Sequence, residues 1–263
     1  MRLPIIQVDA FADAAFTGNP AAVMPLDAWL DDDLLQKIAA ENNLSETAFL
    51  LPDASGVADY ELRWFTPTVE VVMCGHATLA SGHAILAAEP TRERVTFRTR
   101  RAGILEVGRD GDAYTLSLPA LAPSPKPLPE LVAALGVAPV ETLYREGGYC
   151  VVVLENEAAV RAVDPDMRAI AAGGDRQAIV TAPGDATDVV SRMFAPGGGI
   201  DEDPVTGSAH AVITPYWAEK LGRDRFTAFQ ASARGGHVGC TLAGDRVILS
   251  GRCVTVIEGT FLL

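Results

Sequence analysis

Cysteine is scarce in this sequence. The 263 residues include four cysteines and no C-x-x-C pair: Cys74, Cys150, Cys240 and Cys253. So few cysteines exclude a disulfide-stapled scaffold, and the missing pair removes a common zinc or redox signature. We therefore expect the protein in the reducing cytoplasm.

The sequence also lacks long apolar runs and an excess of basic residues. No apolar stretch approaches the roughly 18 residues of a membrane-spanning helix, and residues 1–9 turn polar too soon for a signal peptide. Lys and Arg number 21 against 34 Asp and Glu, for a formal net charge of −13. The one dense basic run, residues 92–101, alternates with Val95 and Phe97 like a solvated strand. Such a surface repels polyanions, so we expect neither nucleic acid nor membrane as a partner.

Apolar residues are plentiful, at 49% of the chain, which is enough for a large core. A proline-rich stretch, residues 120–129, lies near the middle of the chain and reads as a linker. This organisation predicts two domains of similar size, residues 1–119 and 130–263, with the last strand free to return to the first domain.

Three features of the first half recur in the second half in the same order. Residues 63–67 and 192–196 both read R-x-F-x-P. An apolar strand precedes each motif, at residues 47–52 and 178–183. A glycine with small residues follows each motif and leads into a helix-like pattern, at Gly75 and Gly207. This recurrence predicts an internal duplication.

The remaining pattern is rich in strands. A helix is expected over residues 34–41, capped by the acidic run 31–33, whose side chains suit the positive helix start. Residues 240–253 read as a hairpin that turns at 243–245. Strands are expected at residues 4–9, 48–51, 60–65, 95–98, 114–118, 149–154 and 247–249.

The glycine-led helix starts at Gly75 and Gly207 are candidate anion sites. Free backbone N–H groups and the helix dipole act together at such a start. If the two starts faced each other across the gap between the halves, a small carboxylate would meet positive potential from both sides. Alternatively, each glycine only lets its helix pack tightly.

Two carboxylates are candidates for chemistry. Glu46 lies just before an apolar strand, where it could be a plain loop residue or a base whose pKa is raised by partial burial. Asp203 lies in an acidic run before the second helix start. It could complement the helix dipole or orient a substrate.

Cys74 directly precedes Gly75 and His76. A thiol at a helix N-terminus has a lowered pKa and could act as a base or nucleophile. It could equally be a small buried hydrophobe. A metal site from Cys74, His76 and His83 lacks any supporting C-x-x-C or H-E-x-x-H pattern, so we expect no metal.

Several motifs together resemble the PhzF-like isomerase family. They span nearly the whole chain in the family's order: residues 9–11 with 16–21, residues 43–49, residues 65–67 with 74–78, and residues 202–209.

The resemblance implies the α+β diaminopimelate-epimerase-like fold, in which two pseudo-symmetric domains each wrap a curved mixed sheet round a central helix. It also implies a site between the domains, no cofactor and a homodimer. The family's best-known reaction makes a phenazine precursor from a dihydro-hydroxyanthranilate. In such enzymes the residue at the position of Glu46 carries a proton between two substrate carbons. The expected substrate-binding residues are Cys74, Gly75, His76, Asp203, Gly207 and Ser208.

Two departures from the wider fold family matter. Diaminopimelate and proline epimerases use a facing pair of cysteines, whereas here Asp203-Pro204 falls where the partner of Cys74 would be expected. Residues 230–236 also match the family pattern only loosely.

The function we expect is therefore a cofactor-independent proton shift on a small carboxylate, with Glu46 as the general base and acid. One alternative is an amino-acid-type epimerase that uses Cys74 and an opposed carboxylate. Another is a non-catalytic protein that binds small carboxylates.

Overall fold

The computed structural model describes all 263 residues and divides the chain into two compact units. Unit 1 comprises Met1–Ser117 and Ser250–Leu263, and unit 2 comprises Leu118–Leu249. The boundary thus falls at Ser117, and residues 120–129, which we expected as a linker, belong to unit 2.

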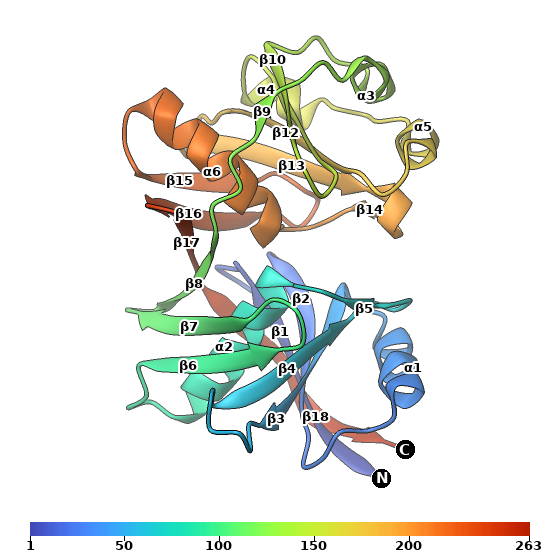
Figure 1. Ribbon diagram of the computed structural model, residues 1–263, viewed down its shortest axis with the longest axis vertical. Helices are drawn as coiled ribbons and strands as arrows, with labels where there is room; N and C mark the ends of the chain where they lie inside the picture. Colours follow the sequence, from blue (N-terminus) through green and yellow to red (C-terminus); the bar gives the residue numbers. More distant parts are fainter. The chain divides into compact units, whose positions relative to one another are not determined.

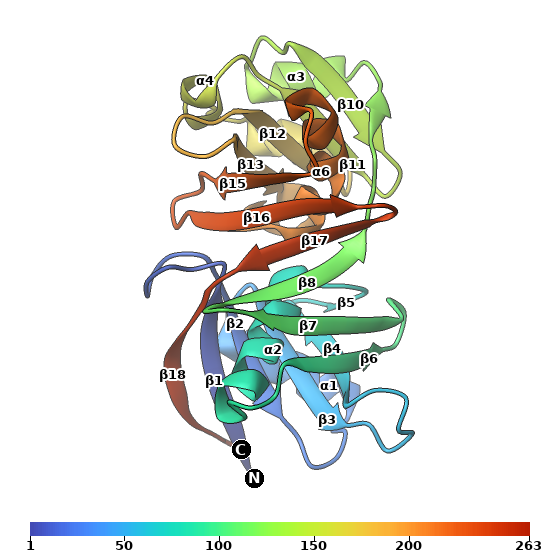
Figure 2. The same cartoon turned by 90° about the vertical axis from the view of Figure 1, so that its left-hand side faces the viewer.

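Unit 1 is a sheet built around one buried helix. Its strands pair in the order β18-β1-β2-β3-β4-β6-β7-β8, and β5 also pairs with β4. The elements are β1 (Arg2–Ala10), β2 (Asn19–Pro25), α1 (Asp32–Asn42), β3 (Glu46–Pro52), β4 (Tyr60–Phe65), β5 (Glu70–Val71), α2 (Gly75–Ala88), β6 (Arg94–Thr99), β7 (Ile104–Asp110), β8 (Ala113–Pro119) and β18 (Cys253–Leu262). Figure 2 shows β18 running beside β1 toward the two chain ends.

Helix α2 is the centre of unit 1. It contacts β1, β2, β3, β6, β7 and β18, and ten of its fourteen residues are buried (Figure 1). The helix approaches β7 so closely that a Cβ on Gly82 would lie 2.3 Å from a methyl carbon of Val107. Glycine at position 82 is therefore a packing requirement.

Unit 2 repeats this plan around α6. Its strands pair in the order β9-β10-β11-β12-β13-β15-β16, β14 also pairs with β13, and β17 neighbours β16. The elements are β9 (Ser124–Pro125), α3 (Pro129–Leu135), β10 (Glu141–Arg145), β11 (Tyr149–Val153), α4 (Glu157–Arg161), α5 (Met167–Ala172), β12 (Gln177–Pro183), β13 (Val189–Ala195), η1 (Pro196–Gly198), β14 (Ile200–Glu202), α6 (Gly207–Leu221), β15 (Arg225–Gln230), β16 (Gly236–Ala243) and β17 (Arg246–Gly251).

The two units share one topology. In unit 1, β3 is parallel to β2 and antiparallel to β4, which is parallel to β6 beyond α2. In unit 2, β12 is parallel to β11 and antiparallel to β13, which is parallel to β15 beyond α6. The predicted internal repeat is confirmed at the level of strand order and direction.

The repeated R-x-F-x-P motif has a structural role in both units. Arg63 Nε and Nη2 donate to the Glu70 carboxylate at 2.8 and 2.9 Å, which holds β5 against β4. Arg192 binds Glu202 in the same two-bond manner, at 2.7 and 3.0 Å, and holds β14 against β13. Each guanidinium also stacks over the motif's own phenylalanine.

Every strand expected from sequence matches a strand of the structure, although the expected strand 149–154 runs one residue past the end of β11, and β16 and β17 flank a turn at Gly244 as expected. The expected helix 34–41 is longer, at Asp32–Asn42. The predicted side-chain cap is wrong: Asp31 makes no capping bond, because only its carbonyl accepts from Leu34 and Leu35. Asp32 instead pairs with Arg63 at 2.9 Å.

The basic run of residues 92–101 is neutralised locally. Val95 and Phe97 are buried in β6, as expected, and the arginines lie outside. Arg92 pairs with Asp59, and Arg98 pairs with Asp53 and Glu61. None of the helices combines the length and apolar character needed to cross a bilayer.

Candidate active site

Glu46 is the first residue of β3 and is buried, with 8% of its surface exposed. Helix α1 ends at Asn43, whose left-handed conformation (φ 49°) turns the chain back toward the sheet. Parallel pairing then places Glu46 beside Ala21 of β2. A carboxylate is thereby held at the beginning of an otherwise apolar strand.

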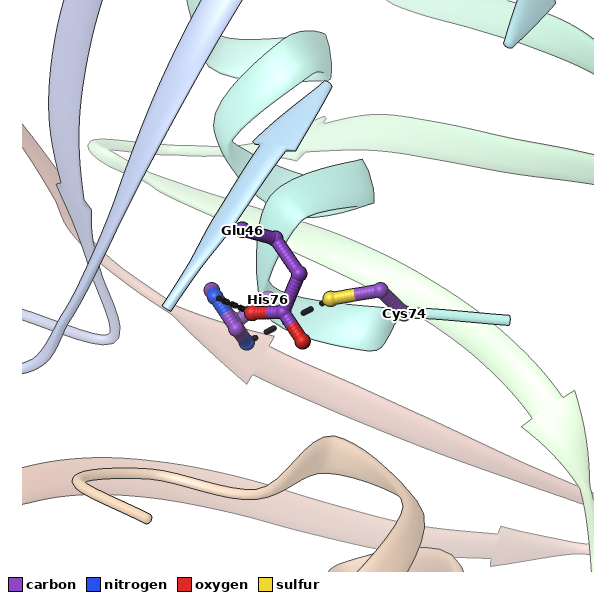
Figure 3. Close-up of side chains that lie close together, drawn as sticks. All are labelled: Glu46, Cys74 and His76. Atoms are coloured by element: carbon purple, nitrogen blue, oxygen red, sulfur yellow. Dashed lines mark hydrogen bonds and ion pairs between the residues drawn. The ribbon is translucent and has the colours of Figure 1, made fainter. Parts of the chain in front are cut away.

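His76 lies in the first turn of α2 and faces Glu46. Its Nε2 is 3.0 Å from Glu46 Oε2 (Figure 3), and only 4% of the residue is exposed. Its other ring nitrogen, Nδ1, lies 3.5 Å from Cys74 Sγ and 3.1 Å from Asn19 Nδ2. Both imidazole nitrogens are therefore engaged, each with a different neighbour.

The electrostatics of this cluster correct one expectation. Burial, followed by the nearby Glu46 charge, raises the pKa of the Cys74 thiol to about 11. The lowered pKa expected for a thiol at a helix start is therefore wrong, and Cys74 is a buried neutral group at pH 7. For His76, burial lowers the pKa, but Cys74 and Glu46 outweigh it and the pKa is raised above its usual value.

Glu46, Cys74 and His76 also form a cluster of potential metal ligands, with one ligand atom from each within 4.8 Å of the others. Glu46 and Cys74, however, contact different nitrogens of the same ring. For an ion bound to one ring nitrogen to reach the residue at the other nitrogen, that side chain would have to move around the edge of the ring. A tight tetrahedral site therefore requires a rearrangement of these side chains. His83 is outside the cluster and bonds Thr255. The arrangement suits an ion pair between Glu46 and His76 better than a metal site.

Helix α2 begins without a side-chain cap. Cys74 occupies the N-cap position in an extended conformation and makes no capping bond, so Gly75 opens the helix. The first N–H groups of an α-helix have no partner among the carbonyl groups of the helix itself. The start of α2 can therefore accept an anionic ligand beside Glu46 and His76.

Unit 2 builds a second cluster at the start of α6. Asp203 is buried, with 7% exposed, and its Oδ2 accepts a hydrogen bond from the Thr206 hydroxyl. Thr206 is the N-cap residue and makes no capping bond, so Gly207 and Ser208 open this helix uncapped. The structure thus gathers Asp203, Gly207 and Ser208 in unit 2, and Glu46, Cys74, Gly75 and His76 in unit 1.

The repeat also corrects the expected counterpart of Cys74. Because α2 begins at Gly75 and α6 at Gly207, the N-cap residue Thr206 is the structural equivalent of Cys74, and Asp203-Pro204 precedes it in the loop. The equivalent of Glu46, the first residue of β3, is Gln177, the first residue of β12. Only unit 1 therefore has a carboxylate at this position.

Sequence reasoning did not single out two buried residues of these clusters. Asn19 contacts His76, and its only sequence signal was its position between Gly18 and Pro20 in a family-like motif. Gln230, which is 0% exposed, accepts from the Thr206 N–H at 2.9 Å and donates to the Asp203 carbonyl at 2.7 Å. It lies in the segment that matched the family pattern only loosely.

Known proteins resemble this chain over its full length. A family model described as phenazine biosynthesis-like protein matches residues 8–259. An uncharacterized isomerase of Pseudomonas aeruginosa is 47% identical, with 100% of both chains covered. A solved PhzF-family phenazine biosynthesis protein from Enterococcus faecalis has a TM-score of 0.92 at 42% identity, again over 100% of both chains. A structure described as a predicted epimerase from P. aeruginosa shares the fold alone, with a TM-score of 0.75 at 18% identity over 99% of each chain.

Proposed function

This chain belongs to the phenazine biosynthesis-like (PhzF) family of isomerases, and we propose that it moves a proton between two carbons of a small carboxylate substrate with Glu46 as the proton carrier. Family membership and the α+β fold class bear out what the motifs indicated. The identity of the base, the substrate and the independence from cofactors belong to the proposal.

One observation carries the assignment of Glu46. It is a buried carboxylate, 3.0 Å from an imidazole nitrogen, at the uncapped start of a helix that can accept an anion. A general base must lie within reach of the proton that it takes, and a substrate anion bound at the start of α2 would lie beside Glu46. Among the expected site residues of unit 1, Glu46 alone is a buried carboxylate beside a helix start.

The chemistry then follows in two steps. The ionised Glu46 removes a proton from a carbon next to the substrate's activating group, and the C–H electron pair moves into the adjacent π system. Glu46, now protonated, gives the proton to the carbon one allylic position away, and the π electrons close the new C–H bond. Because one group makes both transfers, the proton moves on one face of the substrate.

Main-chain and polar groups supply binding and charge stabilisation. The N–H groups at the start of α2 bind a carboxylate of the substrate and stabilise the charge that develops on the intermediate, and the start of α6 in unit 2 offers donors of the same kind. We assign Cys74, His76, Asp203 and Ser208 to the substrate's remaining polar groups. Asp203 is suited to an amine or hydroxyl donor, because one of its carboxylate oxygens is already held by Thr206.

The alternative function, an epimerase, requires Cys74 as an acid or a base. With a pKa of about 11, this thiol is almost wholly protonated at pH 7, so very little thiolate is present to take a proton. Its equivalent in unit 2 is Thr206 rather than a second cysteine. The proton shift through Glu46 is therefore the better-supported function.

The test measures deuterium incorporation from D2O by proton NMR. The compounds are a dihydro-hydroxyanthranilate, proline and diaminopimelate, and the variants are Glu46→Gln and Cys74→Ser. We expect the wild-type protein to introduce deuterium into one of these compounds. The rate of exchange should fall about 10²- to 10⁴-fold in Glu46→Gln and change little in Cys74→Ser. Glu41→Gln, an exposed change on α1, is the matched control.

The outcomes separate the three functions. Near wild-type exchange in Glu46→Gln would show that Glu46 is not the proton carrier. A large loss in Cys74→Ser with exchange at the α-carbon of proline or diaminopimelate would favour the epimerase. Binding of these compounds without any label would favour the non-catalytic binder. Location in the cytoplasm and assembly as a homodimer remain predictions, which fractionation and light scattering would test.

A further inference from the structure

Unit 2 holds a cleft that is lined by none of the residues assigned to the proton shift. Its volume is about 570 Å³, which is in the range of small-molecule binding sites. We propose that this cleft binds a small apolar molecule that carries a carboxylate, and that Lys126 and Arg176 hold the carboxylate. The proposal does not depend on the role of Glu46.

The walls of the cleft are mainly apolar. They come from the chain that leads into α3, from the adjacent strands β10 and β11, and from the turn after α5. Leu131 and Cys150 are buried and belong to the apolar core of unit 2, and Leu128 and Tyr144 pack against that core. Core residues that also line a cleft favour a ligand with an apolar body.

A smaller cavity of about 280 Å³ adjoins the cleft. Leu131, Gly173 and Arg176 are among the residues that line both, and Ala169 and Ile170 of α5 line the smaller one. Helices α3 and α5 contact each other at this point of unit 2 (Figure 1). The apolar body of a ligand therefore has room to extend along these helices while its charged group stays beside Arg176.

The first cation of the cleft, Lys126, is fixed to β10. Its N–H donates to the Thr142 carbonyl at 3.0 Å, and the Thr142 hydroxyl donates to the Lys126 carbonyl at 2.7 Å. Lys126 Nζ lies 3.8 Å from the centre of the Tyr144 ring and has no ion-pair partner. The ammonium group is therefore held over an aromatic wall of the cleft with its charge unpaired.

The second cation, Arg176, lies against the end of α5. A Cβ on Gly173 would be 2.8 Å from Arg176 Cζ, so the absence of a side chain at residue 173 makes room for the guanidinium. The ion-pair partner of Arg176 is Glu130, at 3.9 Å and with 86% of its side chain exposed. Such a distant and solvated pair is weak, and Asp175, the other acid of the lining, is also exposed. The guanidinium therefore has donors available for a ligand.

The charges of the two cations act on the same part of the cleft. Burial raises the pKa of the Cys150 thiol, and the charges of Arg176 and then Lys126 oppose this rise. Both cations therefore contribute positive potential at Cys150. A carboxylate bound beside this residue would be attracted by both side chains while its apolar body contacts the walls.

The test follows the binding of 1-naphthoate, which has an apolar body and one carboxylate, to ¹⁵N-labelled protein by NMR with assigned amide signals. We expect the amides of Leu131, Gly148 and Gly173, which line the cleft, to shift with a Kd below about 1 mM. 1-Naphthalenemethanol has the same rings without the charge and should bind at least about tenfold more weakly.

Three variants test the cations. Arg176→Ala and Lys126→Ala each remove one charge. Gly173→Ala keeps the guanidinium but forces it to move, because the new Cβ would overlap Arg176 Cζ. Each variant should weaken the binding of 1-naphthoate about 10- to 100-fold. The matched control is Arg168→Ala, which removes an exposed arginine of α5 that lines neither cavity and should leave the affinity unchanged.

The outcomes decide the proposal separately from the proposed function. Shifts confined to the amides of Gly75 and His76, or no binding with a Kd below about 1 mM, would overturn it. Equal affinity for the alcohol, or wild-type affinity in the folded variants of Lys126, Gly173 and Arg176, would show that the cations do not hold the carboxylate. Glu46→Gln should bind 1-naphthoate in the cleft as wild type does, whatever its effect on deuterium exchange.

Discussion

Cys74 should be inert toward alkylation at neutral pH, although it lies at the start of a helix. Its pKa of about 11 means that about one molecule in 10⁴ carries a thiolate at pH 7. A thiol at the ordinary value of 9.0 would be ionised in about one molecule in 100. Reaction with iodoacetamide should therefore be about 100-fold slower than that of a free thiol, before the burial of the side chain slows it further.

The assay follows modification of the native protein by mass spectrometry after short exposures between pH 7 and 10, with peptide mapping to separate Cys74 from the other three cysteines. The rate at Cys74 should rise about tenfold per pH unit over this range, because only the thiolate reacts. If Cys74 in the native protein is alkylated as fast as free cysteine at pH 7, its pKa is not raised. That result would refute the reasoning and would again favour the epimerase function.

The same pKa predicts a change of stability with pH. The unfolded thiol loses its proton near pH 9 and the folded thiol near pH 11, so the stabilising contribution is full below pH 9 and is lost as the pH rises to 11. A difference of two pKa units corresponds to about 3 kcal/mol. Urea unfolding of wild type should lose more free energy over this range than Cys74→Ser, and equal slopes would contradict the assignment.

Two further predictions concern the helix starts and the packing that holds them. Gln230→Ala should lower the free energy of unfolding by about 2–5 kcal/mol, because the change leaves the buried Thr206 N–H and the Asp203 carbonyl without these hydrogen bonds. Urea unfolding measures this loss, and a loss below about 1 kcal/mol would argue against the role of Gln230. Gly82→Ala should cost about 1–3 kcal/mol, because the new methyl would overlap Val107; an unchanged melting temperature would show that β7 moves aside freely.

Local sequence was sufficient for the repeat and for part of the secondary structure. The strands at residues 48–51 and 60–65 follow from their aromatic and aliphatic residues, and the helix starts follow from Gly75 and Gly207. These features depend on neighbours within a few positions, so composition and spacing predict them. The family motifs then led to Glu46, Cys74, His76, Asp203 and Ser208 as site residues.

The tertiary structure decided what those residues can do. Asn19, Glu46 and His76 come from β2, β3 and α2, and only the packing of these elements brings the three side chains into contact. The pKa of Cys74 is a second example. The position of Cys74 at a helix start predicts a lowered pKa, but burial beside Glu46 raises the pKa instead. Protonation depends on desolvation and on charges that distant parts of the chain bring together. Sequence spacing therefore determined which residues to consider, and three-dimensional packing set their chemistry.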